Sequence, residues 1–86
     1  MTDAEINLAI AKLEYPETRN LKLWVEQNFV SYTEGWYDIG KIIEREGIAI
    51  RPVPRGWEAS HGSSIVIADT PAKAAALCYL KTKVVN

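Results

Sequence analysis

A lone histidine beside several serines is the first feature of this chain that could do chemistry. His61 lies in the sequence ASHGSS, and the nearby hydroxyl and carboxyl groups belong to Ser60, Ser63, Ser64 and Asp69. A serine, a histidine and an acid can form a nucleophilic triad. Small polar residues around a glycine are nevertheless typical of a loop between strands, and the segment has neither a nucleophile elbow nor a glycine-rich oxyanion motif. We therefore interpret it as a loop and predict no catalytic residues.

Metal and cofactor chemistry is not indicated either. Cys78 is the only cysteine, which excludes an internal disulfide, and with one histidine it leaves too few ligands for a structural zinc site. It sits among Ala and Leu, where a cysteine is usually a small buried hydrophobe. No phosphate-binding loop is present. We predict no metal, no cofactor and a reducing, cytoplasmic setting.

Binding is the chemistry that the segment RPVPRGWEASHG favours. Arg51, Arg55, Trp57 and His61 could form a basic hairpin tip with a stacking aromatic ring, as in proteins that hold single-stranded nucleic acid. The net charge of −1, from ten basic and eleven acidic residues, provides no general attraction for phosphate. Nucleic-acid binding is therefore the alternative. A plain hairpin does not require the two arginines. If the protein has a charged contact surface, this hairpin is therefore its expected place.

Aromatic residues suggest a surface for protein partners, because Trp and Tyr are common anchors in interfaces. The chain has three Trp and four Tyr. Such rings also fill the core of a small domain. Trp24 is the ring expected at the surface, since it alternates with Leu23 and Val25. The candidate binding surface comprises Trp24, Arg51, Arg55, Trp57 and His61, and an exposed sheet edge could also pair with a second copy of the chain.

The elements that must position these residues begin with a helix over residues 2–14. Thr2 and Glu5 form a capping box, and Ile6, Ile10 and their neighbours make one apolar stripe. Alternating apolar residues over 21–32 then predict a β-hairpin. A short helix from about Asp38 to Glu46 follows. Gly40 inside it predicts either a marginal helix or a close packing neighbour.

The second half predicts more strands and a final helix. Residues 48–53 and 57–60 read as strands around a bend at residues 54–56, and Pro52 belongs at a sheet edge. The apolar run 63–69 predicts a strand inside the sheet. Thr70 caps a helix over 71–83, whose small residues would let it lie close to a sheet, and residues 84–86 form a loose tail.

These elements give the order α-β-β-α-β-β-(β)-α in a single domain, residues 1–86. We predict an α+β sandwich with helices packed on a mainly antiparallel sheet. The chain is 48% hydrophobic, which is typical of a folded domain. It has neither a basic, apolar leader nor an apolar run long enough to cross a bilayer, so a soluble, cytoplasmic protein with no membrane contact is expected.

Three stretches resemble a known family. MTDAEINLAIAKL, WYDIGKIIEREGIAIRPVPRGWEAS and ADTPAKAAALCYL look like the NinX-type proteins of lambdoid phages and prophages, which are grouped with the phage ABA sandwich domain. The match spans nearly the whole chain in order. The chain departs from the pattern at Ile39-Gly40, where the family often has Ala-Trp, and in a shorter second hairpin and following loop.

The resemblance implies a phage or prophage origin, a bacterial cytoplasm and a family without an established activity. Taken with the residues, it leads us to expect a non-enzymatic accessory protein that binds a host or phage protein. The alternative is a small nucleic-acid-associated protein that uses Arg51, Arg55 and Trp57.

Overall fold

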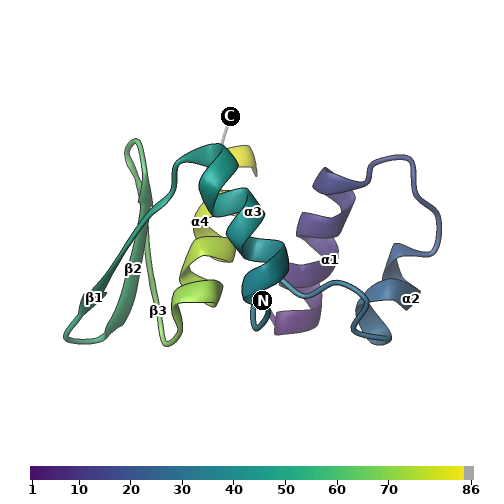
Figure 1. Cartoon of the computed structure of the whole chain (residues 1–86), viewed down its shortest axis with the longest axis horizontal. Coiled ribbons are helices and arrows are strands. Elements are labelled where there is room, and N and C mark those ends of the chain that lie inside the picture. Colours follow the sequence, from purple (N-terminus) through teal and green to yellow (C-terminus); the bar gives the residue numbers. More distant parts are fainter. Residues whose placement is uncertain (85–86) are drawn as a thin grey trace.

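The computed structural model describes residues 1–84 and confirms the α+β class (Figure 1). The elements are α1 (Asp3–Glu14), α2 (Leu21–Glu26), α3 (Trp36–Glu46), β1 (Ala49–Val53), β2 (Gly56–His61), β3 (Ser64–Ala68) and α4 (Pro71–Val84). Of the expected tail, residue 84 ends α4 and residues 85–86 lie outside the described part. No helix within residues 1–84 is long and apolar enough to cross a membrane.

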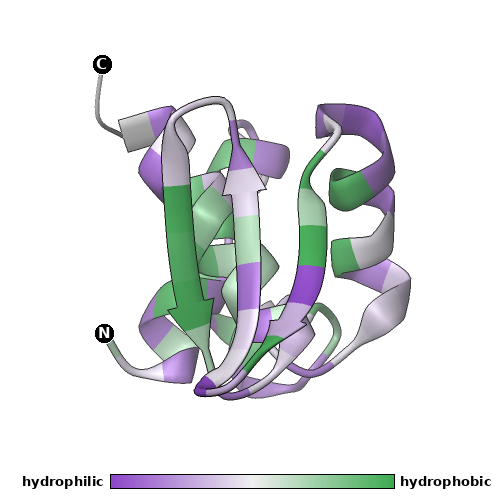
Figure 2. Ribbon diagram, turned by 90° about the vertical axis from the view of Figure 1, so that its left-hand side faces the viewer, coloured by the Kyte–Doolittle hydropathy of each residue, from purple (hydrophilic) through white to green (hydrophobic). Residues whose placement is uncertain are grey.

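The elements are arranged as successive layers. The sheet is antiparallel with the order β1-β2-β3. One of its faces packs on α4, which also contacts α3 and α1, and α2 packs on α1 at the far end. Figure 1 shows this succession along the 38 Å long axis, from the sheet to α2. The second face of the sheet is not covered by a helix (Figure 2).

Helix α4 lies at the centre and begins as the sequence predicts. The Thr70 hydroxyl accepts a hydrogen bond from the Lys73 N–H at 3.2 Å, and Pro71 is the first helical residue. The expectation that small residues let this helix approach the sheet is confirmed, since α4 contacts all three strands. Its buried residues are Ala72, Ala74, Ala75, Ala76, Cys78, Tyr79 and Leu80.

Helix α1 is also as predicted. The Thr2 hydroxyl accepts from the Glu5 N–H at 3.2 Å, and the Glu5 carboxylate accepts from the Thr2 N–H at 2.7 Å, which completes the capping box. Ile6 and Ile10 are fully buried against the core. The apolar stripe of this helix therefore faces inward.

The hairpin predicted over residues 21–32 is wrong, because residues 21–26 form helix α2 and the chain from 27 to 35 has no regular structure. Leu21 and Val25, four residues apart, are buried, while Leu23 is 49% exposed. Burial thus follows the period of a helix rather than that of a strand. A strand here would also need a partner strand, and α1 supplies a helical surface instead.

The position predicted for the apolar strand is also wrong. The strand expected inside the sheet is β3, which lies at an edge, and β2 is the central strand. Ile65 and Ile67 are about half exposed, so the apolar pattern on both faces did not signal burial on both faces. The prediction that Pro52 lies at an edge is confirmed, because β1 is the other edge strand.

The bend between β1 and β2 depends on Gly56. Its φ of 139° is one that side-chain-bearing residues rarely adopt, and a Cβ there would lie 2.4 Å from the Ala68 carbonyl oxygen. The glycine therefore lets the hairpin turn against the end of β3.

Asn7 ties the irregular segment after α2 to α1. Its Oδ1 accepts from the N–H groups of Tyr32 at 2.7 Å and Thr33 at 3.2 Å, and its Nδ2 donates to the Thr33 hydroxyl at 3.3 Å. All three residues are buried. This one side chain therefore satisfies two buried backbone donors and fixes the chain that leads into α3.

Replacing Asn7 by Ala is expected to lower the free energy of unfolding by about 2 to 3 kcal/mol, because two buried N–H groups lose their acceptor. Urea titration followed by circular dichroism measures the loss. Thr33→Val is the control, since it leaves both backbone bonds and removes only the acceptor of the Asn7 Nδ2 group, so it should cost less, about 1 kcal/mol. Equal losses in the two variants would contradict this role of Asn7.

Candidate functional site

The best candidate site is the outer face of α3. This helix begins at Trp36, earlier than the predicted start at Asp38. The Asp38 carboxylate accepts from the Ser31 N–H at 3.1 Å, so it holds the preceding loop and is not the N-cap. Ile39 and Ile42 are buried. The residues on the opposite side of the helix face outward.

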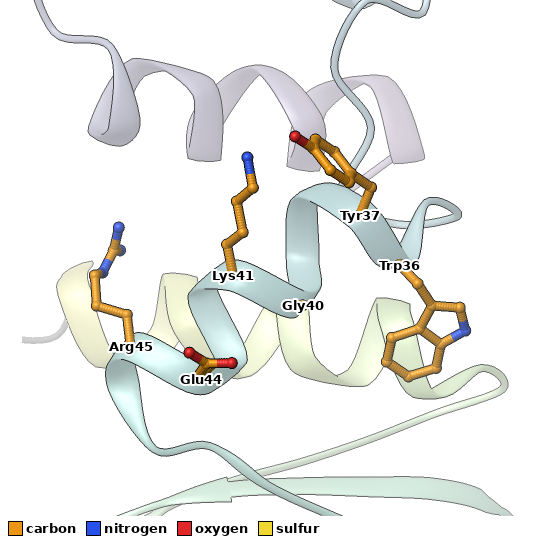
Figure 3. A pocket seen from close by; sticks show the side chains of 6 residues that line it. All are labelled: Trp36, Tyr37, Gly40, Lys41, Glu44 and Arg45. Atoms are coloured by element: carbon orange, nitrogen blue, oxygen red, sulfur yellow. The ribbon is translucent and has the colours of Figure 1, made fainter.

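Two large aromatic rings at the start of α3 are exposed. Trp36 is 55% and Tyr37 76% exposed. They border an open pocket of about 680 Å³, which we call the α3 surface. Its residues are Trp36, Tyr37, Gly40, Lys41, Glu44 and Arg45. In Figure 3, Tyr37, Lys41 and Arg45 point to the same side of α3, Trp36 points to the other, and Gly40 lies in the gap between the rings and Glu44.

Gly40 forms the floor of the pocket. The sequence predicted either a marginal helix or a close neighbour at this position, and the second explanation is wrong, because a Cβ placed there would have no atom within 4 Å apart from its chain neighbours and the backbone of its own helix. The missing side chain instead leaves a notch between Trp36 and Glu44, which lie four residues to either side.

Lys41 is the cation that the α3 surface offers. Its ammonium group lies 4.1 Å from the centroid of the Tyr37 ring. The interaction with the Tyr37 side chain raises the pKa of Lys41, which stays charged at neutral pH. Within residues 1–84 no carboxylate forms an ion pair with it. Its charge is therefore available to a bound partner.

Arg45 has a different role, because it holds α3 against α1 and α4. Its guanidinium group donates to both carboxylate oxygens of Glu14, at 2.7 and 2.9 Å, and to the Tyr79 hydroxyl at 3.1 Å. The Tyr79 hydroxyl in turn donates to Glu14 at 2.6 Å. The Arg45 hydrogen bonds lower the pKa of Glu14, although partial burial opposes this, and burial raises the pKa of Tyr79 to about 12.

The hairpin residues expected to bind lie on both faces of the sheet. Arg51 faces Glu58 across the strands and donates to its carboxylate at 2.7 and 3.3 Å, on the uncovered face. This ion pair accounts for Arg51 without a ligand. Trp57 is half-buried and packs against the core on the other face, and Arg55 is exposed in the turn.

Asp69 does not converge with His61 and the neighbouring serines. His61 pairs with Ser64 at one end of the β2-β3 hairpin, whereas Asp69 follows the far end of β3. A five-residue strand spans roughly 15 Å, so the acid is out of reach of the imidazole. No group of three His, Cys, Asp or Glu side chains in residues 1–84 is placed to hold a metal ion.

The expectation that Trp24 is the surface ring is wrong. Trp24 is half-buried and packs edge-on against Tyr15, with ring centroids 5.8 Å apart. The most exposed of the three tryptophans is Trp36. A helix starting at Trp36 would have placed Tyr37 opposite Ile39, but the predicted start at Asp38 left Tyr37 in a loop. Trp36 lies three residues before Ile39 and would be expected on the same face, so the helical spacing gave no signal of its exposure.

Glu14 makes stability depend on pH with a defined sign. Its pKa is lower in the folded chain than its ordinary value of 4.5, so the carboxylate stabilises the fold above about pH 4.5, and this contribution is lost as the pH falls through the folded pKa. Glu14→Gln should therefore cost about 1 kcal/mol at pH 7 and progressively less toward pH 3. Urea titrations at several pH values measure the difference.

Tyr79→Phe provides the control for this pH dependence. It removes one hydroxyl from the cluster but keeps the Glu14 carboxylate and its two bonds to Arg45. As the pH falls below 4.5, the stability of this variant should still decrease by most of the amount seen in the natural protein. A constant difference between Glu14→Gln and the natural protein from pH 7 to pH 3 would contradict the assignment.

Comparison with known proteins finds no family model, no curated protein and no solved structure that matches the chain. Its function must therefore be inferred from the α3 surface and from the sequence.

Proposed function

We propose that the chain is a non-enzymatic binding module whose α3 surface holds a segment of a partner protein. The observation that carries this proposal is the pair of exposed rings, Trp36 and Tyr37, beside the notch at Gly40. Tryptophan and tyrosine are strongly enriched among the residues that dominate the binding energy of protein interfaces. Their contribution to that energy is largest where a partner excludes water from them.

The residues around the notch define what the partner segment must offer. An apolar side chain seated over Gly40 would bury the flanks of Trp36 and Tyr37. A carboxylate beside it would pair with Lys41, which contacts the Tyr37 ring but forms no ion pair with a carboxylate within residues 1–84. We thus infer that the partner presents an apolar residue next to an acidic one.

The setting is part of the same proposal. The resemblance to the NinX-type family supports a phage or prophage origin and a bacterial cytoplasm, so the partner is a host or phage protein. Our alternative, binding of single-stranded nucleic acid by Arg51, Arg55 and Trp57, has less support. Glu58 neutralises Arg51, and Trp57 packs on the other face of the sheet, where it cannot stack on a base held by that arginine.

Loss of the two rings tests the binding surface. We expect the natural protein to capture a partner from bacterial lysate and Trp36→Ala/Tyr37→Ala to weaken the affinity for that partner at least about tenfold. The fold should persist, since both rings are exposed. Phe29→Ala is the matched control, because Phe29 is 68% exposed but lies before α3, outside the pocket. Equal binding by the natural protein and the double variant would refute the α3 surface.

Filling the notch separates binding from stability. Gly40→Gln adds a side chain where there is open space, so it should raise the free energy of unfolding by about 0.5 to 1 kcal/mol through helix propensity. The same side chain would occupy the pocket and weaken partner binding. Isothermal titration and urea titration on one preparation measure both effects, and a stabilised variant that binds as well as the natural protein would contradict the proposal.

A further inference from the structure

The outer edge of β3 has backbone groups that point away from the sheet. The Ile65 carbonyl oxygen accepts from the Lys81 ammonium group at 3.4 Å, so this carbonyl faces away from β2. Along an antiparallel strand both backbone groups of a residue point to one side, and successive residues alternate. The N–H and C=O groups of Ile65 and Ile67 therefore face the open edge.

The side chains of the same two residues are exposed on the uncovered face of the sheet. Ile65 and Ile67 are 53% and 49% exposed and pair with Ser60 and Glu58, while Val66 between them packs toward the core. Figure 2 looks onto this face, with β3 as the hydrophobic strand at the left. Unpaired backbone groups and apolar side chains thus coincide on one edge strand, which favours pairing with another strand.

The opposite edge of the sheet does not offer the same surface. In β1, Pro52 has no N–H to donate, and Arg51 would bring like charges together if two copies met there. From Ser64 to Ala68, β3 has no proline and no charged residue. Two copies could therefore meet at β3 without repulsion between side chains of the strand.

We propose that a second copy of the chain pairs with β3 in antiparallel orientation, with Val66 on the two-fold axis. Ile65 then faces Ile67 of the second copy, and each such pair exchanges two backbone hydrogen bonds. The isoleucines of both copies form one apolar patch on the uncovered face. The two three-stranded sheets become continuous, and this interface leaves the α3 surface free.

Lys81 sets the strength of this pairing. In a single chain the Lys81 ammonium group donates a hydrogen bond to the Ile65 carbonyl oxygen. In the pair, the same oxygen accepts from the N–H group of Ile67 of the second copy. The lysine must therefore release that oxygen before the strands join. A different arrangement, in which the uncovered sheet faces stack on one another, would not involve Lys81, because α4 lies behind the sheet.

Sedimentation equilibrium across protein concentrations up to about 100 µM tests the pairing, since a small interface gives a weak dimer. The natural chain should form dimers, and Ile65→Lys/Ile67→Lys should be monomeric, because lysines of the two copies would face each other. In a single chain these lysines face Ser60 and Glu58, so the fold is kept. Leu13→Lys/Leu23→Lys adds the same charge at exposed helical positions and should dimerise normally.

Two further variants test the edge and the register. Lys81→Ala should tighten the dimer roughly fivefold by freeing the carbonyl oxygen. Mixed Ile65→Cys and Ile67→Cys proteins should form a disulfide-linked heterodimer on mild oxidation, faster than either variant alone, since facing residues lie within disulfide range and Cys78 is buried. A monomeric natural chain, an unchanged Lys81→Ala dimer, or equal cross-linking of the single variants would each overturn the proposal.

Discussion

The burial of α4 on every side is the constraint on which the rest of the structure depends. The helix contacts all three strands on one side and α1 and α3 on the other, so it has no face for solvent along most of its length. Alanines at 74, 75 and 76 and the thiol of Cys78 are fully buried, and Ala59 is the fully buried residue of the facing strand. Small side chains on both sides permit close contact between backbone and backbone.

Two surfaces remain uncovered because α4 alone forms the centre of the fold. The sheet packs on α4 with one face, which leaves the other face and the β3 edge outside. Helix α3 packs on α4 with its isoleucines, and the hydrogen bonds among Glu14, Arg45 and Tyr79 fix its orientation. The α3 surface and the β3 edge are thus separate consequences of the same packing, and one chain can use both at once.

The sequence predicts elements well where capping chemistry marks their ends. The capping box of Thr2 and the Thr70-Pro71 pair locate α1 and α4 to within a residue or two. The prediction fails at residues 21–26 because the apolar residues Leu21, Leu23 and Val25 suit a strand as well as a short helix. Only packing against the neighbouring helix α1 decides between the two. The α3 surface was missed for a related reason. Gly35 offers no side-chain cap, so the start of α3 at Trp36 had no local signal.

The composition of the core explains why the exposed rings are not needed for folding. Much of the buried contact between α4 and the sheet is made by small side chains, and the core closes without either ring of the α3 surface. Trp36 and Tyr37 instead place much of their ring area in water, beside a helical glycine that costs about 1 kcal/mol relative to alanine. Apart from the contact of Lys41 with Tyr37, the exposed ring area and the glycine add little stability to the isolated chain. A bound partner would bury both rings and fill the notch, and this is the physical reason for proposing that the α3 surface binds a partner.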